Sequence, residues 1–187
     1  MSVRLPRVPR WFLEVAVITA VLSLTRASLA DHYVVPSGSM KPSVQIGDHV
    51  CVAKASYGVR VPFTEDWLLQ YDAPNRGDVV VLHSPESGDV LLKRVVAVEG
   101  DEVTVRDGIV TTSGARESST AYPLRLDAGG GPDFGPVRVP RDQVLVMGDN
   151  RGDSHDGRVF GFVRRGAVLG RALSVCVRDG APTWQPL

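Results

Sequence analysis

The sequence has no excess of charge of either sign, because 21 lysines and arginines balance 21 aspartates and glutamates over 187 residues. A protein whose main partner is nucleic acid needs a basic surplus to neutralise phosphates, so we expect no nucleic-acid partner. Histidine and cysteine are scarce, with four and two copies, and no Cys-x-x-Cys pair occurs. We therefore expect no structural metal site.

The two cysteines, Cys51 and Cys176, each lie in a short run with the alternation of a β-strand, at 49–52 and 174–177. Outside the cytosol such a pair can form a disulfide, whereas strand cysteines also serve as small core residues. The sequence leaves both interpretations open.

The sequence has one long hydrophobic run near its N-terminus, from Trp11 to Ala30. About 20 residues form a helix of about 30 Å, enough to cross the apolar core of a bilayer. Glu14 and Arg26 lie close to its two ends, where long charged side chains can reach the headgroups. We therefore predict a single transmembrane anchor at 11–30.

Basic residues set the expected orientation of this anchor. Arg4, Arg7 and Arg10 precede it, so the positive-inside rule puts residues 1–10 in the cytoplasm and residues 31–187 on the extracytoplasmic side. Two other interpretations compete. The run also has the layout of a cleavable secretory signal, with small residues at Ser28 and Ala30, and it could instead be an interfacial or buried helix.

The chain beyond residue 30 has the pattern of a mainly β domain. Glycine and proline, with 19 and 13 copies in the whole sequence, separate short runs rich in valine and leucine. These runs predict strands at 48–54, 78–82, 90–98, 103–106, 137–139, 143–147 and 168–177. A short helix is expected only near Ser154 or Phe160. The segment 107–136 is richer in Gly, Ser and Thr, and should form a loop or a small β-extension.

Ser39 is a candidate nucleophile in the segment Ser-Gly-Ser-Met-Lys-Pro at 37–42. Prolines at 36 and 42 prevent a helix or a regular central strand there, so we expect a fixed, exposed turn. Peptide hydrolysis by serine needs a positioned hydroxyl, a base and donors for the oxyanion. The turn suits that chemistry, and it equally suits any loop rich in Gly, Ser and Pro.

Lys93 is the candidate base, because it alternates with Leu91 and Val95 on one face of a predicted strand. A free lysine has a pKa of ~10.4, and burial can lower it by several units. A buried neutral lysine can then act as a general base without histidine. The alternative is a lysine at a sheet edge whose amine reaches solvent.

A dense polar turn at 148–158 completes the set of candidate residues. It could be a solvated loop whose internal ion pairs contribute little to stability. In the functional interpretation, Ser154 hydrogen-bonds and aims the lysine amine, while Asp156 and Arg158 pair and fix the loop.

In this order, these segments resemble the bacterial type I signal peptidases. That family shows Pro-Ser-Gly-Ser-Met-x-Pro, Gly-Asp-x-Val, Lys-Arg-Val-Val with a Gly-Asp soon after, and Gly-Asp-Asn-Arg-x-x-Ser-x-Asp-x-Arg-x-x-Gly. This chain matches the four patterns at 36–42, 47–50, 93–101 and 148–161. It departs from the family at 97–101, where Gly and Pro are usual, and at 152–153, where Asp-Asn is usual.

The resemblance implies a membrane-anchored serine endopeptidase that removes signal peptides from exported preproteins, with preproteins and membrane lipid as partners. It implies a signal-peptidase-like β-sheet catalytic domain preceded by one uncleaved transmembrane helix, with no metal or cofactor. Ser39 would be the nucleophile and Lys93 the general base. Ser37 and the Ser39 N–H would form the oxyanion hole, with Ser154 orienting the lysine, and support would come from Asp149, Asp156 and Arg158.

Other serine chemistries fit poorly. No Gly-x-Ser-x-Gly elbow occurs, and at the Ser-x-x-Lys spacing Ser39 is followed by Pro42. The alternative of another class is a catalytically inert, membrane-anchored β-domain that binds a partner.

Overall fold

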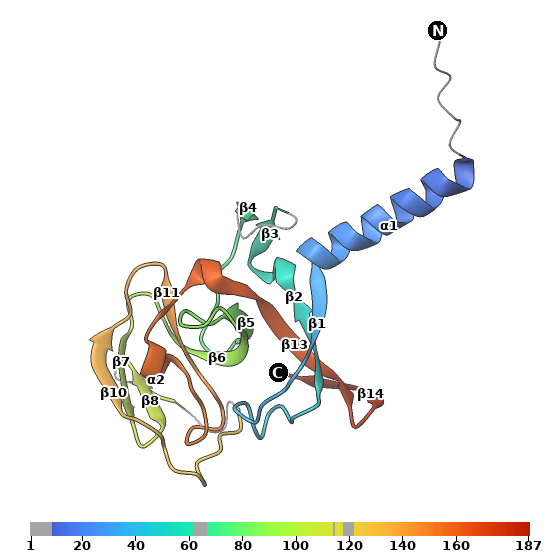
Figure 1. The fold of residues 1–187 in the computed structure, drawn as a ribbon. Coiled ribbons are helices and arrows are strands. Elements are labelled where there is room, and N and C mark those ends of the chain that lie inside the picture. The colour runs from blue at the N-terminus through green and yellow to red at the C-terminus, as the bar shows by residue number, and fades with distance from the viewer. Residues whose placement is uncertain (1–8, 62–66, 114, 118–121) are drawn as a thin grey trace.

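The computed structural model describes residues 9–61, 67–113, 115–117 and 122–187 of the chain. Most of the expected cytoplasmic segment, including Arg4 and Arg7, lies outside the described residues. A long helix, α1 (Arg10–Ser28), follows Pro9 and extends away from the rest of the molecule (Figure 1). Proline favours the first turn of a helix, and the apolar residues that follow contain no glycine or proline to interrupt it.

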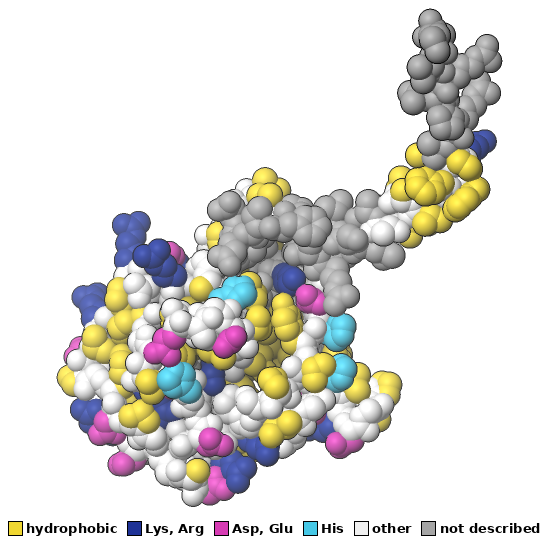
Figure 2. Space-filling view, viewed as in Figure 1, with side chains coloured by type: hydrophobic (Ala, Val, Ile, Leu, Met, Phe, Trp, Pro, Cys, Tyr) yellow, Lys and Arg dark blue, Asp and Glu magenta, His cyan; other side chains and the backbone are white. Residues whose placement is uncertain are grey.

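The described side chains of α1 are exposed although most are apolar. Trp11, Phe12 and Ile18 are 64%, 53% and 58% exposed, and hydrophobic side chains cover the described part of the helix in Figure 2. In the part of the chain that the structure describes, no helix meets the length and hydropathy needed to cross a membrane.

The body of the protein is built on an eight-stranded antiparallel sheet in the order β1-β2-β13-β5-β6-β11-β12, with β14 added on β13. Its strands are β1 (Ala30–Val34), β2 (His49–Ala53), β5 (Val79–His83), β6 (Val90–Val98), β11 (Gln143–Met147), β12 (Val163–Arg164), β13 (Val168–Arg178) and β14 (Ala181–Pro186). The predicted mainly β architecture is therefore confirmed.

Two smaller sheets flank this one (Figure 1). A four-stranded sheet joins β7 (Glu102–Arg106), β8 (Ile109–Thr112), β9 (Ala115–Arg116) and β10 (Phe134–Arg138) in the order β10-β7-β8-β9. A hairpin pairs β3 (Gly58–Arg60) with β4 (Trp67–Gln70). The described residues also form three single turns of helix: η1 (Lys54–Ser56), α2 (Gly157–Phe160) and η2 (Arg165–Ala167). The short helix α2 occurs where the sequence allowed one.

Strand β5 lies at the centre of the hydrophobic core. Val79, Val80, Val81 and Leu82 are all buried, since β5 is covered on both faces. Val79 and Val81 pack with Met40, which belongs to the Ser39 turn, whereas Val80 and Leu82 pack with Val95 of β6 and residues of β11. The hydrophobic core thus packs both the Ser39 turn and β6, the strand that carries Lys93, against β5.

The structure joins Cys51 to Cys176 in a disulfide between the neighbouring strands β2 and β13, across 125 residues of sequence. Of the two interpretations that the sequence left open for these cysteines, the structure shows the disulfide.

Candidate active site

The Ser39 turn follows β1 and is held by buried residues on both sides. Val35, Met40 and Val44 are 5%, 1% and 0% exposed and belong to one hydrophobic cluster. Ser39 itself is partly exposed. The hydroxyl of Ser37 lies 3.5 Å from that of Ser39, so the turn presents two adjacent hydroxyl groups at the surface of the domain.

Lys93 lies on β6 and is buried, with 3% of its surface exposed. Its Nζ donates a hydrogen bond of 3.0 Å to the Ser154 hydroxyl. Burial lowers the pKa of Lys93 to about 8, although the nearby Asp156 carboxylate acts in the opposite direction. The amine is therefore neutral in a substantial fraction of molecules near neutral pH.

Ser39 and Lys93 meet at the junction of two cavities. One cavity of about 450 Å³ has mainly apolar walls that include Tyr33, Val50 and Leu92, and the other, of about 490 Å³, is lined by polar groups such as Ser84, Glu86 and Asp153. Both cavities are lined by Ser37, Ser39 and Lys93. Among the hydrogen bonds of the described residues, none joins Ser39 Oγ to Lys93 Nζ.

The polar loop at 148–158 is a buried framework and not a solvated turn. Asp156 and Arg158 are 0% and 6% exposed, and the guanidinium Nε and Nη2 donate to the carboxylate at 2.8 and 2.9 Å. Asp156 also accepts from the Gly148 N–H at 3.0 Å and caps α2. Burial acts to raise the pKa of Asp156, but the bonds from Arg158 and Gly148 outweigh it and hold the pKa below its usual range.

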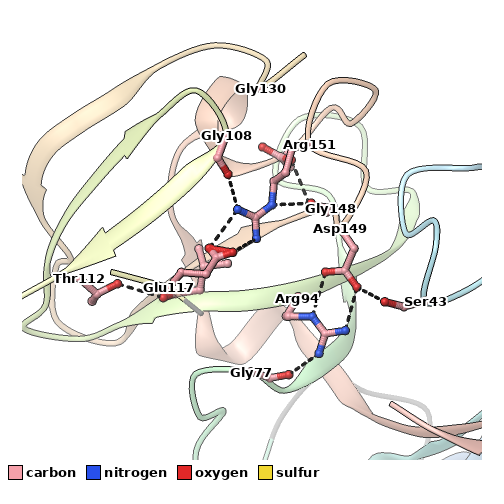
Figure 3. Close-up of polar contacts among 12 residues, drawn as sticks. Ser43, Gly77, Arg94, Gly108, Thr112, Glu117, Gly130, Gly148, Asp149 and Arg151 are labelled. Carbon is pink, nitrogen blue, oxygen red and sulfur yellow. Dashed lines mark hydrogen bonds and ion pairs between the residues drawn. The ribbon is translucent and has the colours of Figure 1, made fainter. Parts of the chain in front are cut away.

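Asp149 connects the Ser39 segment with the Lys93 strand (Figure 3). Its carboxylate is 0% exposed and accepts two hydrogen bonds of 2.8 Å from Arg94, the residue after Lys93. It also accepts a 2.5 Å hydrogen bond from the Ser43 hydroxyl, and Arg94 donates to the Gly77 carbonyl. One carboxylate therefore ties together the segments that carry Ser39, Lys93 and Ser154.

A third buried ion pair, between Arg151 and Glu117, joins this loop to the chain directly after β9 of the four-stranded sheet, as Figure 3 also shows. Arg151 and Glu117 have side chains 0% and 5% exposed, and Arg151 also donates to the carbonyls of Gly108 and Gly148. Sequence reasoning missed Ser43, Arg94 and Glu117. Arg94 belongs to a segment shared with the family and offered a signal, and Ser43 directly follows another, whereas nothing in the sequence around Glu117 pointed to Arg151.

Each of the seven residues singled out from the sequence lies in or next to this arrangement. Ser37, Ser39 and Lys93 line the cavities, Ser154 contacts Lys93, and three residues form buried ion pairs around them: Asp149, Asp156 and Arg158. Within the described ranges, no group of three or more His, Cys, Asp or Glu side chains is arranged to hold a metal ion.

Comparisons with known proteins agree with this chemistry. The family described as "Signal peptidase, peptidase S26" matches residues 8–177. A probable signal peptidase I-2 of Synechocystis is 36% identical, over 83% of this chain and 68% of that protein. A signal peptidase I of Leptolyngbya laminosa is 32% identical, over 83% and 73%. A thylakoidal processing peptidase 1 of Arabidopsis thaliana is 36% identical, over 80% and 43%.

The matching family and these relatives define the class of protein, which is a serine endopeptidase. The chain belongs to the signal peptidase family, peptidase S26, and is similar throughout most of its length to type I signal peptidases.

Proposed function

We propose that Ser39 and Lys93 form a catalytic dyad that cleaves signal peptides from exported preproteins. The observation that carries this proposal is the buried Lys93 amine, held by Ser154 at 3.0 Å and lining the same two cavities as Ser39. With a pKa of about 8, roughly a tenth of the amine is neutral at pH 7, against about one molecule in a few thousand for a free lysine.

The proton transfer follows from the bonds that the amine can make. A neutral amine has two N–H donors and one lone pair. One N–H donates to Ser154, which leaves the lone pair available for the Ser39 hydroxyl proton. The Ser39 oxygen attacks the scissile carbonyl, and the ammonium then gives the proton to the departing amine. Water, activated by Lys93 in the same way, releases the acyl group.

The oxyanion that forms during attack needs donors positioned in advance. The Ser37 hydroxyl lies 3.5 Å from Ser39 Oγ, and the Ser39 N–H belongs to the same turn. We assign these two groups to the oxyanion hole. The contacts of Asp149, Asp156 and Arg158 keep the three catalytic segments in register.

We also propose that the apolar segment 11–30 as a whole, of which α1 is the described helical part, anchors the protein in a membrane with the catalytic domain on the extracytoplasmic side. Apolar side chains such as Trp11 and Phe12 are exposed on the helix, which is costly in water and favourable in lipid. The disulfide between Cys51 and Cys176 supports an oxidising, extracytoplasmic compartment. Protease protection of the domain in sealed membrane vesicles tests the orientation, and digestion from the cytoplasmic side alone would contradict it.

The test of the dyad is cleavage of a preprotein by purified Ser39→Ala and Lys93→Ala variants. We expect both to lose cleavage while keeping the circular dichroism of the parent. Lys41→Ala is the matched control, because Lys41 is a partly exposed lysine two residues from Ser39 that lines neither cavity. Substantial turnover by folded Lys93→Ala would refute the base, and an inert parent protein would favour the partner-binding alternative.

The expected substrate has small side chains at the first and third positions before the cut, as the family resemblance implies. Mass spectrometry of the products of an Ala-x-Ala preprotein, and of one with bulky residues at both positions, tests this. Equal cleavage of the two would leave only a general Ser-Lys protease.

A further inference from the structure

We propose that Asn150 is a positioning residue that fixes the direction of the Ser39 N–H, and this inference rests on the catalytic roles proposed above. Asn150 is buried, with 4% of its surface exposed, and it does not line either cavity at the Ser39–Lys93 pair. Its effect on the reaction is therefore indirect.

Asn150 binds the Ser39 turn through two hydrogen bonds to consecutive carbonyls. Its side-chain Nδ2 donates to the Gly38 carbonyl at 3.1 Å, and its backbone N–H donates to the Ser39 carbonyl at 3.0 Å. The two chains pack closely here, since a Cβ added at Gly148 would come within 2.4 Å of the Ser39 carbonyl. The polar loop thus holds both peptide groups that flank Ser39.

The planarity of the peptide bond connects this contact to the oxyanion. The Gly38 carbonyl and the Ser39 N–H belong to one planar trans unit and point in opposite directions. A donor that fixes the carbonyl therefore fixes the N–H. That N–H has no hydrogen-bond partner among the described residues, as an oxyanion donor requires before substrate arrives.

The peptide between Gly38 and Ser39 needs a contact that holds it, because the residue before Ser39 is a glycine. A Gly38 backbone can adopt many conformations, so the peptide plane after it can rotate unless something holds it. The Lys41 N–H also donates to the Gly38 carbonyl, at 3.1 Å, but it comes from the same turn. Asn150 provides the contact from outside the turn.

The orientation of the Asn150 amide agrees with this role. The opposite orientation would set Oδ1 against the Gly38 oxygen, bringing two acceptors together. In the observed orientation Oδ1 is buried without a hydrogen-bond partner among the described atoms. The side chain therefore leaves its acceptor unpaired and uses its donor on Gly38.

The test compares Asn150→Asp and Asn150→Ala with the parent in steady-state cleavage of a preprotein. Asn150→Asp keeps the shape but replaces the donor with an acceptor. Loss of one well-aimed oxyanion donor typically lowers kcat by about 10²–10³. Because Asn150 acts through the peptide plane, we expect a fall in kcat of about tenfold or more in both variants, with KM unchanged. In the uncharged Asn150→Ala, the pKa read from kcat/KM should also be unchanged.

The control is Tyr57→Phe, which also removes one buried hydrogen bond, from Tyr57 to Asp78 at 2.9 Å, between two residues that line neither cavity at the dyad. It should lower the melting temperature and leave kcat unchanged. A kcat within threefold of the parent in both Asn150 variants overturns the inference. In Asn150→Ala, a change in KM as large as that in kcat, or a shift of the pKa read from kcat/KM, also overturns it, because Asn150 would then act on substrate binding or on Lys93.

A second variant covers the case in which Asn150→Ala is poorly folded. A Cβ at Gly38 would meet its nearest atoms at 3.5 Å, so alanine fits there and limits rotation of the peptide. Gly38→Ala should restore part of the kcat lost in Asn150→Asp. No recovery, with both proteins folded, counts against the inference. The dyad is tested separately by Ser39→Ala and Lys93→Ala, so its failure is distinguishable.

Discussion

Replacement of Lys93 by methionine should stabilise the protein at neutral pH while abolishing its activity. The folded state lowers the Lys93 pKa from 10.5 to about 8, so it binds this proton less tightly than the unfolded chain does. Between these values the unfolded state carries more protons, and stability rises with pH. Below pH 8 the full penalty applies. At about 1.4 kcal/mol per pKa unit it amounts to about 3 kcal/mol.

The assay is urea unfolding of the parent and Lys93→Met from pH 6 to 10.5. Methionine has a similar length and no charge, so it removes the penalty. We expect the stability difference in favour of the variant to be about 3 kcal/mol larger below pH 8 than at pH 10.5. Loss of the Ser154 contact adds an offset that does not depend on pH. Lys41→Met is the control, and a pH-independent difference for Lys93→Met would refute the lowered pKa.

Three further predictions concern the supporting groups. Asp156→Asn removes the carboxylate that raises the Lys93 pKa, so the basic limb of kcat/KM should move to lower pH; a move to higher pH would contradict this. Asp149→Ala leaves Arg94 buried without its carboxylate and should cost about 3–5 kcal/mol in urea unfolding. Asp133→Ala, which breaks the exposed ion pair with Arg106, should cost under about 1 kcal/mol. Equal losses of stability in Asp149→Ala and Asp133→Ala would contradict the larger role of the buried pair. Cys51→Ser with Cys176→Ser should cost about 2–4 kcal/mol, and an unchanged unfolding midpoint would argue against the disulfide.

The sequence predicted the strands whose side chains are buried and uninterrupted. The runs 90–98 and 143–147 coincide with β6 and β11, because valine and leucine fill them between turn-forming residues. The sequence missed β14, which contains two prolines and is exposed throughout. That strand pairs with β13 across the short turn at 179–180, and its prolines and its lack of a buried face hide the alternation by which a strand is recognised in sequence.

The same distinction applies to the site. Ser39, Lys93, Ser154 and the Asp156–Arg158 pair came from motifs, whose residues are close in sequence or belong to known segments. The contact from Ser43 to Asp149 spans 106 residues, and that from Arg151 to Glu117 spans 34. Such contacts depend on how the strands pack, and local patterns carry no information about them.

The sequence places Lys93 with Leu91 and Val95 on one face of a strand, and the next residue, Arg94, on the opposite face. The structure buries both, at 3% exposure each. Asp149 accepts two hydrogen bonds from Arg94, whereas among the described residues the Lys93 amine hydrogen-bonds to the Ser154 hydroxyl alone. This difference in partners explains why the lysine is the residue available for proton transfer.

The pH dependence of kcat/KM for preprotein cleavage tests most directly whether Lys93 is the base. Because kcat/KM reports the free enzyme, the profile should rise through a pKa of about 8 and then level off. A profile with no basic limb below about pH 10, where a free lysine titrates, would contradict the assignment of Lys93.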